Sequence, residues 1–136
     1  MRYKFVVLLI LIIIVGSMIY LLNFVLKKSF EKNFVFYELE NKKLKLLVAD
    51  EPKEWEQGLM FARNPVDFDG MIFLFPDKQI RYFWNKNTFV DLDVYWLDDD
   101  KIIGRDFLPS IEKTQEIKTI QSPASVNKVI EVIIKN

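Results

Sequence analysis

The feature that most constrains this chain is an uncharged apolar run from Phe5 to Leu26, whose only polar side chains are Ser17 and Asn23. As a helix with a rise of roughly 1.5 Å per residue, the run would be about 33 Å long. That length matches a bilayer hydrocarbon core of roughly 30 Å. A helix in the core of a soluble protein would instead show a polar face. We therefore predict a transmembrane anchor over residues 5–26.

The segments that flank this run favour an anchor that is retained after export. The basic N-terminus, residues 1–4, is typical of a secretion signal, but the apolar stretch exceeds the roughly 7–15 residues of such a signal. Residues 27–30 (KKSF) show no small-x-small cleavage pattern. Lysines lie on both sides, so the positive-inside rule gives little bias. A signal-like anchor normally exports the part of the chain on its C-terminal side. We therefore expect a single-pass protein of the cell membrane with its N-terminus in the cytoplasm. A juxtamembrane linker at residues 27–33 would connect the anchor to an extracytoplasmic domain at residues 34–136.

The formal net charge is zero, but the charge is divided along the chain. Residues 1–32 carry five basic and one acidic side chain, a net charge of +4, which leaves −4 for the rest of the chain. A mildly acidic domain without a basic stripe is a poor partner for a phosphate backbone. We therefore expect the lipid bilayer, and not nucleic acid, to be a partner.

The chain contains no cysteine and no histidine. This excludes disulfides, cysteine nucleophiles, Ser-His-Asp triads and ordinary zinc sites, so acid–base chemistry must use carboxylates, lysine or tyrosine. Asp98, Asp99 and Asp100 could suggest Ca²⁺, which prefers oxygen ligands, but we interpret them as a solvated turn. We expect no cofactor and no metal.

Beyond the linker the pattern is mainly that of short strands, with period-two alternation in Lys43–Val48 and a continuous apolar run at Met71–Phe75. One short helix is indicated between Asp50 and Met60, because an acidic start is followed by a proline in the first turn. Gly58 is expected to mark its end or a close approach of the backbone. The fold class is thus mainly β: a small β-barrel or two-sheet sandwich with one short helix, preceded by a single transmembrane helix. Strands are predicted over residues 34–40, 43–48, 71–75, 79–85, 90–97, 101–107, 116–121 and 128–135.

Four segments together resemble the domain-of-unknown-function 192 family. They are, in the family's order, EWEQGLM at residues 54–60, GMIFLFP at 70–76, FWNKNT at 83–88 with Leu92-Asp93, and KVIEV at 128–132. The resemblance covers roughly residues 44–134. It implies a compact, mainly β fold, often secreted or membrane-tethered in bacteria and archaea, but no established reaction.

Two departures from the family's pattern bear on any pocket. Asn85 stands where the family usually has methionine, and the sequence ends at Asn136 where many members continue with a glycine-rich segment. If such a tail closes a pocket in other members, we expect the pocket here to be open or altered.

The segment from Trp84 to Asp93 is the best candidate for a site. It places a cation, an amide and a hydroxyl side by side in a turn, followed by two carboxylates at spacing two, which would face one side of a strand. Convergent polar groups beside aromatic rings could bind a small polar ligand such as a sugar. The candidate ligand-binding residues are Trp84, Lys86, Asn87, Thr88, Asp91 and Asp93.

These residue types have structural uses as well. Asn and Thr often hold turns by bonding their own backbone, and an Asp at a strand end can accept backbone N–H bonds. The favoured hypothesis is a non-catalytic envelope module that binds a small polar ligand or an envelope protein. The alternative is a hydrolase of an envelope polysaccharide that uses Asp91 and Asp93, with Lys86 stabilising charge. The first hypothesis is better supported because it asks less of the sequence, which says nothing of the oligomeric state.

Overall fold

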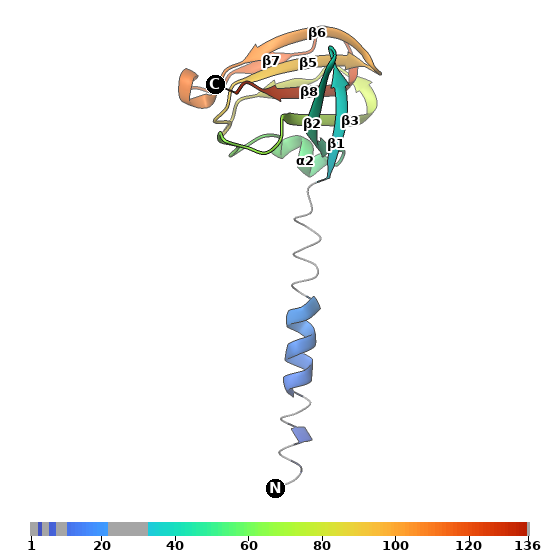
Figure 1. Cartoon of the computed structure of the whole chain (residues 1–136), viewed down its shortest axis with the longest axis vertical. Coiled ribbons are helices and arrows are strands. Elements are labelled where there is room, and N and C mark those ends of the chain that lie inside the picture. The colour runs from blue at the N-terminus through green and yellow to red at the C-terminus, as the bar shows by residue number, and fades with distance from the viewer. Residues whose placement is uncertain (1–2, 4–5, 8–10, 22–32, 136) are drawn as a thin grey trace. The chain divides into compact units, whose positions relative to one another are not determined.

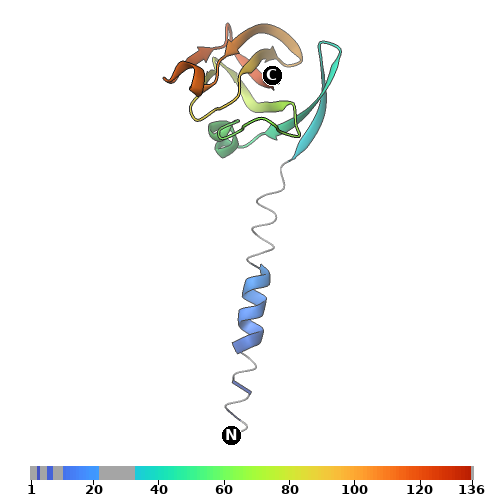
Figure 2. The same ribbon diagram turned by 60° about the vertical axis from the view of Figure 1, so that its left-hand side comes forward.

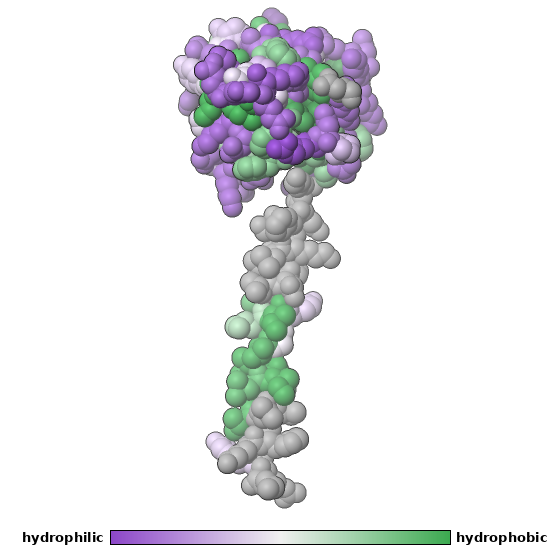
Figure 3. Space-filling view, turned by 90° about the vertical axis from the view of Figure 1, so that its left-hand side faces the viewer, coloured by the Kyte–Doolittle hydropathy of each residue, from purple (hydrophilic) through white to green (hydrophobic). Residues whose placement is uncertain are grey.

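The computed structural model describes residues 3, 6–7, 11–21 and 33–135. These residues fall into two compact units, Met1–Lys32 and Asn33–Asn136. In the first unit, residues 11–21 are helical and expose apolar side chains (Figure 3). Among the described residues no helix has both the length and the hydropathy to span a bilayer. Parts of the predicted anchor, residues 5–26, and nearly all of the linker, residues 27–33, lie outside the described residues, so the anchor stays a prediction.

The second unit is mainly β, with two sheets (Figure 1). The larger sheet has six strands in the order β1-β2-β3-β8-β5-β6, and the smaller one pairs β4 with β7. β2 and β3 run parallel, whereas every other pair is antiparallel. The strands are β1 (Phe34–Leu39), β2 (Lys42–Ala49), β3 (Gly70–Gln79), β4 (Tyr82–Trp84), β5 (Leu92–Asp98), β6 (Lys101–Leu108), β7 (Thr119–Gln121) and β8 (Val126–Ile133).

The two-sheet expectation is confirmed, and the barrel alternative is wrong for the described strands. The larger sheet runs from β1 at one edge to β6 at the other, so it does not close on itself. The expectation of one short helix also needs correction, because α3 (Ile111–Thr114) joins the expected α2 (Pro52–Gln57). α3 is a single turn, too short to show a helical period in the sequence.

The first two strands form a hairpin that projects at one side of the domain (Figure 2). The turn lies at Glu40 and Asn41, both with positive φ, of 48° and 65°. Positive φ at both turn residues suits the twist of a two-residue hairpin. The strands predicted over residues 34–40 and 43–48 imply a turn one residue later, at Asn41-Lys42.

Alternate residues of the central strands are buried on opposite faces of the larger sheet. On β3, Met71 and Phe73 pack into one cluster, while Ile72 packs into a second cluster with Leu74 against it. Strand β8 divides in the same way, with Val129 and Ile133 on the first face and Ile130 on the second. A strand buried on both faces has the continuous apolar run seen at residues 71–75.

β3 continues past the end of the strand predicted over residues 71–75, through Pro76 and as far as Gln79. Its pairing with β8 is irregular between Leu74 and Gln79, so Pro76 lies where no regular ladder needs its missing N–H. β4 is correspondingly shorter than the strand predicted over residues 79–85.

Candidate functional site

A glutamate lies in the middle of the buried sheet. Glu131 is on β8, opposite Met71 of β3 and Val94 of β5 in the ladder, and alternation places it on the same face as Val129 and Ile133. Only 3% of its surface is exposed. Its Oε2 atom is buried and has no hydrogen-bond partner in the described part of the chain. Burial raises the pKa of the Glu131 carboxyl to about 8, so the group is largely a neutral acid at pH 7.

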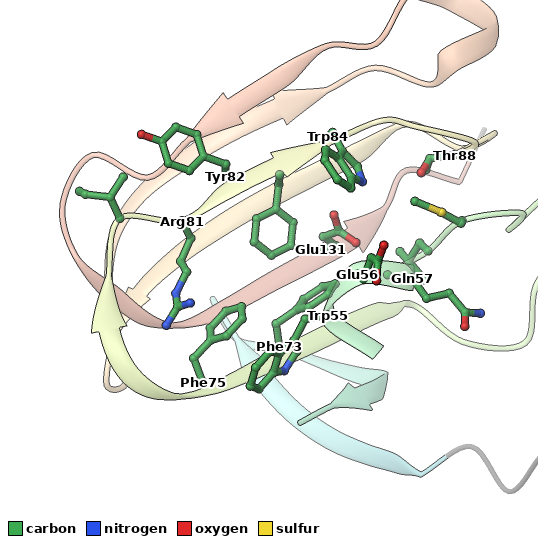
Figure 4. A pocket seen from close by; sticks show the side chains of 15 residues that line it. Trp55, Glu56, Gln57, Phe73, Phe75, Arg81, Tyr82, Trp84, Thr88 and Glu131 are labelled. Carbon is green, nitrogen blue, oxygen red and sulfur yellow. The ribbon is translucent and has the colours of Figure 1, made fainter. Parts of the chain in front are cut away.

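Glu131 lines a cavity of about 420 Å³. This volume falls within the range of small-molecule sites. Six of its 15 lining residues are aromatic. Phe73 and Phe83 meet edge to face with ring centroids 4.8 Å apart, and the ring centroid of Trp55 lies 5.0 Å from that of Phe75. In Figure 4, Trp84 lies on one side of the Glu131 carboxyl, and Trp55 and Phe73 lie on the other. Aromatic walls with a few polar groups among them are the usual form of a pocket that orients a ligand.

Helix α2 and the residue that ends it shape one side of the cavity. The helix begins with a reciprocal capping box between Glu51 and Glu54, and the Trp55 indole N–H donates to the carbonyl of Ala49 at 3.0 Å, which fixes the ring. The helix ends at Gly58, whose φ of 48° favours glycine. A Cβ there would lie 3.9 Å from Glu131 Oε2 and 3.5 Å from Phe73, which is ordinary van der Waals contact, so Gly58 brings the end of the helix close to the carboxyl.

A cation also lines this cavity. The Arg81 guanidinium carbon lies 3.9 Å from the centre of the Phe75 ring, and its Nη2 donates to the carbonyl oxygen of Asp77 at 2.9 Å and to its carboxylate at 2.5 Å. The Arg81 Nε–H is buried and has no partner among the described residues. The cavity thus has two buried polar groups, Glu131 Oε2 and Arg81 Nε, that a ligand could satisfy.

Of the six residues predicted as a ligand site, Trp84 and Thr88 line this cavity. Lys86, Asn87, Asp91 and Asp93 are not among its lining residues. Lys86 and Asn87 form the predicted turn, with Lys86 Nζ 5.8 Å from the Trp84 ring centre and the Asn87 carbonyl accepting from the Phe61 N–H at 2.7 Å. The turn itself is confirmed.

The two aspartates have separate partners. Asp91 is buried, accepts the Ser110 backbone N–H at 2.9 Å and pairs with the Lys113 ammonium. Burial opposes its ionisation, but the bonds from Lys113 and Ser110 leave the pKa of Asp91 below its ordinary value. Asp93 pairs with Arg105 at 2.7 Å and lines a second cavity of about 130 Å³. The structure therefore does not bring Asp91, Asp93 and Lys86 together as the hydrolase alternative required.

Asn85, the departure from the family's methionine, holds the loop beside the cavity. Its side chain is fully buried, donates to the Pro109 carbonyl and the Thr114 hydroxyl at 2.9 Å each, and accepts the Lys118 N–H at 2.8 Å. These bonds tie the end of β4 to α3 and to the segment before β7. Asn85 is therefore a structural residue of the loop that carries Trp84 and Thr88.

The acidic turn after β5 is bound by lysines. Lys78 pairs with Asp98 at 2.5 Å and Asp99 at 2.8 Å, and Lys128 pairs with Asp100 at 2.5 Å. Within the described ranges no group of three or more acidic side chains is arranged to hold a metal ion. The side chains of Asp99 and Asp100 are 69% and 83% exposed, so the turn is solvated, as expected from the sequence, and its carboxylates also pair with lysines.

Comparisons with known proteins agree with this fold. The family model DUF192, described as an uncharacterized ACR, matches residues 35–134. A crystal structure from Sinorhizobium meliloti 1021, of a protein assigned provisionally as a transcription regulator, is 27% identical with a TM-score of 0.59, covering 74% of this chain and 76% of that one. A protein of unknown function from Novosphingobium aromaticivorans DSM 12444 is 18% identical with a TM-score of 0.55, covering 76% and 82% respectively. None of the curated proteins matches the chain.

Proposed function

Because the chain belongs to the DUF192 family, which is described as uncharacterized, we propose a function from the features of its own pocket. The protein is a membrane-tethered envelope module that binds a saccharide in the cavity beside Glu131. The observation that carries this proposal is the unpartnered Glu131 carboxyl inside an aromatic cavity of about 420 Å³. A neutral carboxyl can both donate and accept a hydrogen bond. Sugar hydroxyls do the same, so the two groups are complementary.

The aromatic wall supplies the second part of the recognition. The C–H faces of a sugar ring are apolar, and aromatic side chains offer flat apolar surfaces with a large contact area. Trp84 is 44% exposed and Tyr82 is 65% exposed, so both rings present surface at the rim of the cavity. Arg81, whose Nε–H is buried without a partner among the described residues, also lines the cavity.

A titration of tryptophan fluorescence tests binding, because Trp55 and Trp84 line the cavity. We expect saturable changes on adding soluble oligosaccharides of glucose or N-acetylglucosamine. Trp84→Ala should weaken binding by roughly 5- to 30-fold, since losing one stacked ring face removes about 1–2 kcal/mol. Phe107→Ala is the control, because this ring is 53% exposed and absent from the cavity lining. No saturable response to any of these saccharides would overturn the proposal.

The tether is part of the same proposal and rests on the uncharged run at residues 5–26. The full-length protein should pellet with membranes, resist alkaline carbonate extraction and keep its N-terminus. Protease added to intact spheroplasts should digest the domain if that domain lies outside the membrane. Recovery of the intact chain in the detergent-free soluble fraction would contradict the tether, while leaving saccharide binding to be judged by the titration.

A further inference from the structure

Two carboxyl groups in contrasting surroundings line the same cavity. Glu131 is buried, whereas Glu56 is exposed on α2. The Glu56 side chain forms no hydrogen bond or ion pair with any other described residue, unlike Asp91 and Asp93. Two carboxyl groups whose environments differ in this way can divide the roles of acid and base.

We propose that the cavity hydrolyses a glycosidic bond of its bound saccharide, with Glu131 as the general acid and Glu56 as the general base. This inference rests on the proposed saccharide binding and goes beyond it. It also replaces the carboxylates that the sequence suggested for a hydrolase, because Asp91 and Asp93 are held in ion pairs with Lys113 and Arg105.

The reaction balances with one water molecule for each bond cleaved. The Glu131 carboxyl gives its proton to the glycosidic oxygen, the bond between that oxygen and the anomeric carbon breaks, and the leaving sugar departs with a hydroxyl group. Water adds its oxygen to the anomeric carbon and gives a proton to Glu56. Solvent then returns a proton to Glu131 and removes one from Glu56. This division between acid and base is that of an inverting glycosidase.

The surroundings of Glu131 suit an acid. The positions that flank it on β3 and β5, Met71 and Val94, carry no charge, and its pKa of about 8 keeps it protonated at neutral pH. The other charged or titratable groups of the cavity lining are Glu56 of α2, Arg81 of the segment before β4 and Tyr82 of β4. Arg81 is engaged with Asp77. Gly58 lies beside the Glu131 carboxyl, because a Cβ built on it would lie 3.9 Å from Oε2.

The test uses full-length protein in detergent with soluble oligomers of N-acetylglucosamine and of β-linked glucose, and measures new reducing ends. Glu131→Gln should bind these oligomers but cleave about 10²- to 10⁴-fold more slowly, the usual contribution of a general acid. Glu56→Gln should also bind and cleave slowly. Glu38→Gln is the control, because Glu38 is exposed on β1 and absent from the cavity. Wild-type cleavage should fall as the pH rises through about 8.

The outcomes separate the two proposals. Saturable binding by the wild type with no new reducing ends would overturn hydrolysis and leave binding intact. Cleavage by Glu131→Gln at the wild-type rate would overturn the role of Glu131. Absence of both binding and cleavage would overturn the proposed function and this inference together.

Discussion

Replacing Gly70 with alanine is expected to prevent the domain from reaching its folded state. A Cβ at Gly70 would lie 1.9 Å from the carbonyl oxygen of Glu131 and 2.9 Å from its carbonyl carbon. Both atoms belong to the backbone of β8, which lies between β3 and β5 in the larger sheet. The methyl group can be accommodated only if these strands separate. We therefore expect the free energy of unfolding to fall by more than about 4 kcal/mol, which is exceptional for one substitution.

Gly104→Ala supplies the matched control. A Cβ there would lie 2.8 and 3.3 Å from ring carbons of Pro123 and 3.2 Å from a ring carbon of the buried Trp96. These contacts are with side-chain rings and not with the backbone of a central strand, and β6 is an edge strand that can shift. We therefore expect Gly104→Ala to lower the stability as well, but by less than Gly70→Ala. Denaturant unfolding of residues 33–136, which include both core clusters, measures each change. A Gly70→Ala domain that folds to within about 1 kcal/mol of the wild type would contradict the close approach of β3 and β8.

Much of this fold could be predicted from the sequence because its signals are local. Alternation and continuous apolar runs indicated the strands, and the proline and acidic residues after Ala49 indicated α2. The sequence could not decide between an open and a closed sheet, since closure depends on whether β1 meets β6. No pattern within either strand encodes that pairing.

Only part of the candidate site could be predicted from the sequence, because the exact start of β5 could not be predicted. The spacing of Asp91 and Asp93 predicts a shared side only if both lie on one strand, but β5 begins at Leu92. Asp91 therefore lies outside the alternation and accepts the Ser110 N–H. Trp84 and Thr88 were found because they belong to the turn next to the cavity.

Glu131 was missed, although the sequence carried a signal for it. In the run KVIEVIIK, Val129, Glu131 and Ile133 share one face of a strand by period two. A glutamate between two apolar residues on a buried face is unusual, since isolated charges are rarely buried without a partner. The aromatic wall could not be found in this way, because Trp55, Phe73 and Phe83 come from three elements that only the fold brings together.

The free energy of unfolding of residues 33–136 is expected to fall as the pH rises from about 5 to about 9. The folded domain keeps a proton on Glu131 up to about pH 8, whereas an unfolded glutamate releases it near 4.5. The folded state therefore binds more protons in this interval, and stability decreases with pH. The contribution of the protonated Glu131 carboxyl to stability is fully present below pH 4.5 and is lost as the pH rises through about 8. The total change is on the order of 5 kcal/mol, with a slope of about 1.4 kcal/mol for each pH unit.

Few other groups can obscure this dependence. The chain has no histidine and no cysteine, so no other side chain ordinarily titrates in the middle of the interval. The carboxyl groups of Asp69 and Asp91 have pKa values below their ordinary value. They are ionised in both the folded and the unfolded state through most of this range, so they add little to the slope.

Glu131→Gln isolates the effect, because glutamine has nearly the same shape and does not titrate. We expect the variant to show little change in stability between pH 5 and pH 9 and to exceed the wild type in stability at pH 9, where the wild type must bury a charge. Urea unfolding at each pH, with Glu38→Gln as a control that keeps the wild-type slope, measures the difference. Equal slopes for the wild type and Glu131→Gln would mean that the Glu131 carboxyl reaches water or a partner in the folded domain, which would remove the basis for its role as a buried neutral acid.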